Sequence, residues 1–227
     1  FAEANSFSND ISSWNVSNVI HFSEMFRWTN LSAETMCSID SSFSTNQNWY
    51  FNWSFLCESE LDSINQENIH TIVQLWHSNQ EYVIETYGHI SDWDVSSIYD
   101  MSHLFASMSN FDFEISNWDV SNVQNMSGMF SRSAFNGDIS NWDVSNVLNM
   151  HRMFEFSEFN GNVSNWNITS VEYMHAMFEG SEFNQDLSSW DVSNVIDMHY
   201  MFASSEFNGN ISNWDVSNVG EMHGMFA

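Results

Sequence analysis

The sequence has no lysine and no proline, and arginine supplies its three basic residues. Against these stand 30 acidic residues, which give a formal net charge of −27. Because binding to the phosphates of nucleic acids or anionic lipids requires Lys and Arg, this balance argues against both as partners. Runs of 18 apolar residues are also missing, so we expect no insertion into a membrane.

Signatures of enzymes are missing as well. The sequence contains no GxSxG, no HExxH and no glycine-rich phosphate loop. A pair of catalytic carboxylates could lie among the 30 acidic residues, but acids that recur at one position of a repeat do not indicate a unique site. We therefore do not predict an enzyme.

Cysteine is scarce, and both copies, Cys37 and Cys57, lie in one irregular stretch. Two thiols that close one short loop indicate a disulfide formed in an oxidising compartment. The alternative is a pair of free thiols in a reduced cell. Asn30 and Asn52 begin Asn-x-Ser sequons on either side of this stretch, and they are the predicted glycosylation sites if the protein is secreted.

What the sequence does contain is a repeat of 24 residues, of which FNGDISNWDVSNVLNMHRMFEFSE at 135–158 is one copy. Tryptophans mark the period without a slip: Trp118, Trp142, Trp166, Trp190 and Trp214. A fixed period of this length is typical of a solenoid, in which neighbouring copies stack and share one continuous core. The absence of proline suits such a stack, because every coil keeps its backbone donors for its neighbours.

Two patterns within each copy predict its local structure. The segment WDVSNV mixes apolar and polar residues in the manner of a short strand, stacked in parallel with its copies. The segment NMHRMF places Met150, Met153 and Phe154 at i, i+3 and i+4, which is one face of a helical turn. The predicted fold class is therefore α/β, a leucine-rich-repeat-like solenoid of 24-residue coils, each a short parallel strand plus a helical turn, with a helical cap.

The chain divides into four predicted segments. Ile69, Ile72, Val73 and Trp76 follow helical spacing, and Asn79 and Gly88 are suited to begin and end a second short helix. We expect these helices to cover the open end of the array. The segments are 1–30, the last coil of a preceding array; 31–60, a cysteine-containing insertion loop; 61–88, a helical capping segment; and 89–227, a solenoid array of about six coils.

The repeat F-N-x-D-I-S-x-W-D-V-S-N-V-x-x-M-x-x-M-F resembles that of the BspA-like surface proteins, relatives of the leucine-rich repeats. The helical lead-in that ends YGHISDWDVSS at 87–97 is also similar to the start of such arrays. The resemblance covers all but the cysteine loop. It implies an extracellular or cell-surface protein, often an adhesin, without established enzymatic activity and without known functional residues.

In a stack, any residue that recurs once per coil forms a column. The Met and Phe columns, and the Trp column with its indole N–H groups paired to neighbouring carbonyls, are predicted to be core. A column of asparagines that includes Asn122 and Asn146 is predicted to bond between coils through its amides.

Aspartates after tryptophan form an acidic column: Asp94, Asp119, Asp143, Asp191 and Asp215. At a spacing of about 5 Å, each adjacent pair repels by roughly 0.8 kcal/mol even in water, so something must offset the repulsion. One explanation is an Asx turn, in which each carboxylate accepts backbone N–H groups two residues on. The other is calcium bound between coils, because hard cations prefer carboxylate oxygens.

A histidine column occupies four consecutive coils, directly after the first Met of NMHRMF: His151, His175, His199 and His223. Earlier coils carry Ser23, Ser102 and Ser127 at this position. One interpretation is a solvated helical face. The other is a pH-responsive or transition-metal-binding stripe.

From these observations we expect an extracellular structural or adhesive repeat protein. The alternative is a module that binds calcium or glycans along one column, and glycans or a host or cell surface are the expected partners. Phe1 and Phe226 stand at the same phase of the repeat. We therefore also expect a segment of a longer array or fibre that associates with itself head to tail, a contact that generates open filaments.

Overall fold

The computed structural model describes residues 6–23, 25–26, 29, 31–51, 53–57 and 63–227. By its internal contacts the chain forms two units, Phe1–His89 and Ile90–Ala227. None of the described helices is long and apolar enough to cross a membrane.

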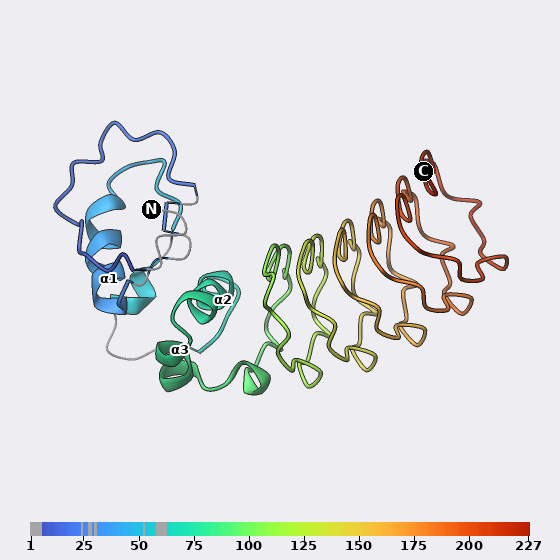
Figure 1. Ribbon diagram of the computed structural model, residues 1–227, viewed down its shortest axis with the longest axis horizontal. Coiled ribbons are helices and arrows are strands. Elements are labelled where there is room, and N and C mark those ends of the chain that lie inside the picture. Colours follow the sequence, from blue (N-terminus) through green and yellow to red (C-terminus); the bar gives the residue numbers. More distant parts are fainter. Residues whose placement is uncertain (1–5, 24, 27–28, 30, 52, 58–62) are drawn as a thin grey trace. The chain divides into compact units, whose positions relative to one another are not determined.

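The N-terminal unit contains the helices α1 (Ala33–Phe43), η1 (Ser54–Cys57), α2 (Ile69–Ser78) and α3 (Gln80–Tyr87) (Figure 1). The stretch that we expected to be a loop thus holds one full helix, α1. Ser32 caps the N-terminus of this helix, because its hydroxyl accepts the N–H of Thr35 at 3.2 Å. A disulfide between Cys37 and Cys57 joins α1 to η1.

The helical spacing expected in 61–88 is confirmed. Helix α2 buries its apolar face, including Ile72 and Trp76. Asn79 then caps α3, because its side chain accepts the N–H of Tyr82 at 3.4 Å. Gly88 ends α3 with a φ of +78°, a conformation that favours glycine. The expectation that these helices cover the open end of the array stays a prediction.

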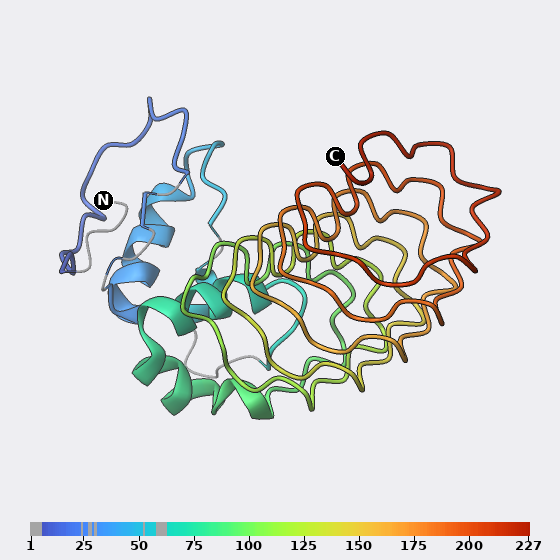
Figure 2. The ribbon, with the colours of Figure 1, turned by 45° about the vertical axis from the view of Figure 1, so that its right-hand side comes forward.

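The C-terminal unit starts with the 3₁₀ helix η2 (Ile90–Asp92) and continues as a row of coils, each beside the next (Figures 1 and 2). Its described residues form no β-strand. Neighbouring coils meet instead through isolated parallel bridges: Asp100 to Asn125, Asn125 to Asn149, Asn149 to Tyr173, Tyr173 to Asp197 and Asp197 to Glu221. The predicted α/β solenoid with stacked parallel strands is therefore wrong.

The segment WDVSNV is not a strand because it contains a turn. In the copy at 142–147, the N–H of Ser145 bonds the side chain of Asp143 and the N–H of Val147 bonds the carbonyl of Val144, each at 3.0 Å. Trp142, Val144 and Val147 are all buried. The apolar pattern thus reflects a bent chain that turns three side chains inward.

The predicted helical turn is wrong as well. The N–H of Met153 bonds the carbonyl of Met150 at 3.1 Å, and Arg152 between them has a φ of +54°. A left-handed third residue is the signature of a type II turn, not of an α-helix. Phe156 repeats this arrangement one turn further on, with a φ of +51°. The spacing of Met150, Met153 and Phe154 places all three in the core, as a helical face would.

The turns leave alternate backbone N–H groups free to reach the next coil. Arg152 and Phe154 donate to the carbonyls of His175 and Met177 at 3.0 Å, and Phe156 donates to that of Glu179 at 2.7 Å. The residues between them donate within their own coil. Each coil is therefore held to the next by its backbone over this whole segment.

Side chains add bonds between coils, as predicted. The indole N–H of Trp166 donates to the carbonyl of Ile139 at 3.0 Å, and the amide of Asn146 donates to the carbonyl of Ser121 at 2.7 Å. Both bonds recur along the stack. In the core, the rings of Phe154 and Phe178 stack with centroids 5.6 Å apart.

We predict that Trp166→Phe lowers the free energy of unfolding by about 0.5–1.5 kcal/mol, because the buried carbonyl of Ile139 loses the indole N–H and keeps only the backbone N–H of Trp142 at 3.2 Å as a donor. Trp214→Phe is the matched control: Trp214 makes the same bond to Leu187 at 3.0 Å but is only part-buried, so we expect a smaller loss. Urea denaturation measures both. Equal losses, or none, would contradict a role for the buried bond.

Candidate functional site

The aspartate column is made of Asx turns. Asp119 Oδ1 accepts the backbone N–H of Ser121 at 3.1 Å and its hydroxyl at 2.6 Å. Each of the other four aspartates accepts the N–H of the serine two residues on: Asp94, Asp143, Asp191 and Asp215. The serine hydroxyl and N–H lower the pKa of these four carboxyls, so the charge is stabilised within each turn.

The calcium interpretation of this column stays a prediction. Among the described residues, the aspartates do not form a group of three or more potential ligands whose ligand atoms lie within 4.8 Å of one another. Their local bonds to serine give them a structural role that needs no ion. The predicted glycosylation sites, Asn30 and Asn52, lie outside the described residues.

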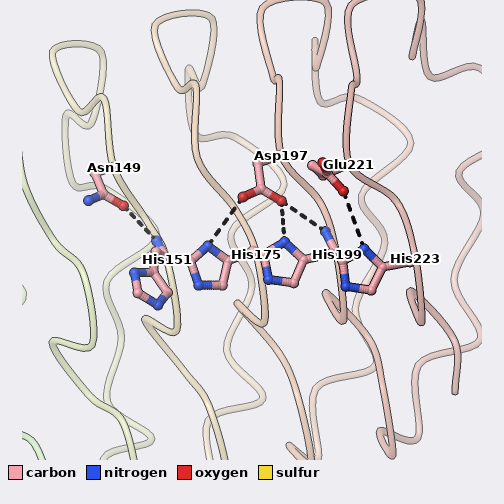
Figure 3. A network of polar contacts seen from close by, with 7 residues as sticks. All are labelled: Asn149, His151, His175, Asp197, His199, Glu221 and His223. Atoms are coloured by element: carbon pink, nitrogen blue, oxygen red, sulfur yellow. Dashed lines mark hydrogen bonds and ion pairs between the residues drawn. The ribbon is translucent and has the colours of Figure 1, made fainter.

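The four histidines form a closely stacked column (Figure 3). The ring centroids of His151 and His175 are 3.5 Å apart, those of His175 and His199 are 4.3 Å apart, and those of His199 and His223 are 4.8 Å apart. Each histidine follows the first Met of a type II turn, so the coil register alone brings the rings together. The side chains of His175 and His199 are 19% and 24% exposed, so these two rings are largely covered, whereas that of His223 is 59% exposed.

Asp197 lies between two of these rings. Its Oδ1 is 2.5 Å from Nδ1 of His199, and its Oδ2 is 3.5 Å from Nδ1 of His175 on the preceding coil (Figure 3). Asp197 Oδ1 also accepts the backbone N–H of His199 at 3.2 Å, so the carboxylate is held in an Asx turn of its own. One carboxylate thus connects histidines of two neighbouring coils.

The column has two further members at its ends. His223 Nδ1 lies 3.4 Å from an oxygen of Glu221, but both side chains are more than half exposed. At the other end, Nε2 of His151 is buried and has no hydrogen-bond partner. The less exposed part of the column therefore runs from His151 to His199.

Burial keeps the inner histidines neutral. The pKa of His151 is lowered to about 4, first by burial and then by the neighbouring His175. The pKa of His175 is also lowered, first by burial and then by His199, while Asp197 acts in the opposite sense. Neutral imidazoles have a free ring nitrogen, which is the form that binds metal ions.

A buried carboxylate lies close to the histidines. Glu155 accepts the hydroxyl of Ser131 at 2.9 Å, and its oxygens lie 3.5 Å from Nε of Arg152 and 3.9 Å from Nε of Arg132. The guanidinium of Arg132 also lies over the ring of Phe156, 4.5 Å from its centroid. Two of the chain's three basic residues thus neutralise Glu155, whereas Asp197 and Glu221 face histidines.

Sequence reasoning found the histidines and missed Asp197 and Glu221. These residues stand two positions before a histidine, in the tripeptides Asp-Met-His and Glu-Met-His. Because an Asx-type turn bonds residue i to the N–H of residue i+2, this spacing is a signal that could have identified both.

Comparison with known proteins shows the family to which the chain is related. The family described as "Mycoplasma protein of unknown function, DUF285" matches residues 1–54, 37–156, 77–182 and 134–227. The chain belongs to this family. Overlapping matches from the first residue to the last are what a repetitive chain produces, and the DUF285 description assigns no activity. No curated protein and no solved structure matches the chain.

Acid should destabilise the protein through His151. Its pKa is about 4 in the fold against 6.5 in the unfolded chain, so the unfolded state binds more protons between these values. The stabilisation is complete above pH 6.5 and is lost as the pH falls toward 4. His175, His103, Arg152 and Asp197 are the charged or titratable groups that act on this ring.

We predict that His151→Ser, which copies Ser127 of an earlier coil, reduces the fall in melting temperature between pH 6.5 and 4. The measurement is a thermal scan at each pH in the presence of EDTA. His21→Ser, which removes a histidine outside the column, should retain the wild-type pH dependence. If His151→Ser also retained it, the buried ring would not be the cause.

Proposed function

We propose that the chain is an extracellular structural or adhesive repeat protein, akin to the BspA-like surface proteins. The observation that carries this proposal is the repetition of one surface along the stack. The Asn column and the aspartate turns recur with the same bonds on successive coils, as in Asn122 to Ser96 and Asn146 to Ser121. A surface of this kind suits many equivalent weak contacts rather than one unique substrate.

An extracellular location is supported by the chemistry of the chain. Disulfides persist in oxidising environments, and Cys37 and Cys57 form one. The net charge of −27 favours solubility. The recurrence of the DUF285 match along the whole chain is in keeping with a long repetitive surface protein.

Head-to-tail association is part of the proposal. Each coil stacks on the next in one register, as the rings of Phe178 and Phe202 do with centroids 5.8 Å apart, and a coil of another copy is proposed to stack in the same way. Such a contact joins different surfaces and generates filaments when it does not close into a ring.

We predict that antibodies raised against the purified chain label intact, unpermeabilised cells of the source. Antibodies are the suitable reagent, because a chain with no lysine and three arginines offers trypsin few sites for surface digestion. A cytosolic protein of the same cells is the control and should be labelled only after permeabilisation. Labelling of the chain only after permeabilisation would overturn the extracellular assignment.

The adhesive role has its own measurement. Beads coated with the chain should adhere to host cell surfaces, and free chain should displace them. Beads coated with bovine serum albumin, which is also acidic, control for charge alone. Displacement by soluble glycans would identify the partner as a sugar, whereas adhesion equal to that of the control beads would leave only the structural role.

A further inference from the structure

We propose that His175, Asp197 and His199 bind a divalent transition-metal ion between two neighbouring coils, with zinc as the representative ion. This inference goes beyond the proposed surface role and does not rest on it. Each of the three side chains offers one ligand atom, and these atoms all lie within 4.8 Å of one another. Among the described residues, the fold brings these three potential metal ligands together.

The ligand types are those that zinc prefers. Imidazole nitrogens and a carboxylate oxygen form the three-residue sets of many zinc sites, with a fourth position left for water or another donor. Calcium, in contrast, takes six to eight oxygen ligands and is poorly served by two imidazoles. The chemistry of the group therefore separates it from the aspartate column, which offers oxygens alone.

The distances suit an ion with little movement of the backbone. Ligands of a tetrahedral zinc ion lie about 3.3–3.5 Å apart when each bond is about 2.0–2.2 Å long. The distance from His175 Nδ1 to Asp197 Oδ2 is 3.5 Å, and this nitrogen is buried without a hydrogen-bond partner. The hydrogen bond between His199 Nδ1 and Asp197 Oδ1 is shorter, at 2.5 Å, and must open to admit the ion.

Opening that bond requires the ring of His199 and the carboxylate of Asp197 to move apart, with the proton of the neutral ring on Nε2. The lone pair of Nδ1 then binds the metal. Asp197 stays bonded to its own coil meanwhile, because its Oδ1 still accepts the backbone N–H of His199 at 3.2 Å. This bond acts as a support that orients the carboxylate ligand, as outer hydrogen bonds do in other metal sites.

Neighbouring rings lie beside the three ligands but outside their group. His151 lies against His175 with a centroid distance of 3.5 Å and His223 lies 4.8 Å from His199, but neither belongs to the group of ligand atoms within 4.8 Å of one another. A water molecule can complete the coordination. Because His175 belongs to one coil and Asp197 and His199 to the next, a bound ion joins coils that are otherwise held by hydrogen bonds and packing.

Two substitutions remove ligands while preserving the local structure. Asp197→Asn deletes the carboxylate but keeps the turn, since Asn149 occupies the same position in its coil and accepts the N–H of His151 at 3.0 Å. His175→Ser copies Ser127, which has the same position in an earlier coil. His21→Ser removes a histidine of the N-terminal unit and serves as the control.

Isothermal titration with zinc chloride, on full chain stripped with EDTA and then dialysed, tests the proposal. We expect saturable binding to the wild type and to His21→Ser, weakened by about tenfold or more in Asp197→Asn and His175→Ser. Zinc should also raise the melting temperature of the wild type more than that of these two variants, because it binds the folded state. Calcium at the same concentration should change the melting temperatures of the wild type and of His175→Ser by the same amount.

Three results would overturn the site: no zinc binding by the wild type, equal binding by all variants, or equal stabilisation of the wild type and Asp197→Asn. Melting curves in EDTA confirm that each variant is folded before metal is added. None of these results bears on the cell-surface labelling, so the two proposals fail independently.

Discussion

The structure depends on how the backbone of each coil divides its hydrogen-bond donors. Through the turn segment, Met153 and Glu155 donate within their own coil, while Arg152 and Phe154, which alternate with them, donate to the next coil. This alternation requires left-handed residues at fixed positions, and non-glycine residues such as Arg152 adopt that conformation at a cost. The bonds to the next coil compensate for it, because they leave few buried N–H groups unpaired.

A stack held in this way has no freedom of register, and that decides what its side chains can do. Every recurring residue lies beside its own copy, so a recurring charge faces a like charge. The aspartates meet this problem within their own turns, by accepting serine N–H and hydroxyl groups. The histidines meet it differently: burial keeps His151 and His175 neutral, and Asp197 lies between two rings. The same register that builds the core therefore concentrates imidazoles in one place.

Much of this could be predicted from the period alone, because stacking follows from repetition. The indole bond of Trp166 and the amide bond of Asn146 were predictable, since a buried donor in a stack finds its acceptor on the neighbouring coil. The local conformation was not. The spacing of Met150, Met153 and Phe154 is that of a helical face. An arginine at position 152 does not indicate that the φ of this residue is positive. Glycines at the equivalent positions 128 and 224 were the available hint. Asp197 was missed because Asn, Tyr and Glu occupy its position in other coils.

The most direct test of the account is to detect the hydrogen bonds between coils by NMR, through scalar couplings across the bond from amide nitrogen to carbonyl carbon. In deuterated, isotopically labelled chain, the amide nitrogen of Phe154 should couple to the carbonyl carbon of Met177, and that of Arg152 to the carbonyl carbon of His175. Coupling of Phe154 to the carbonyl of Met150 would mean that the segment is an α-helical turn, and would contradict the account.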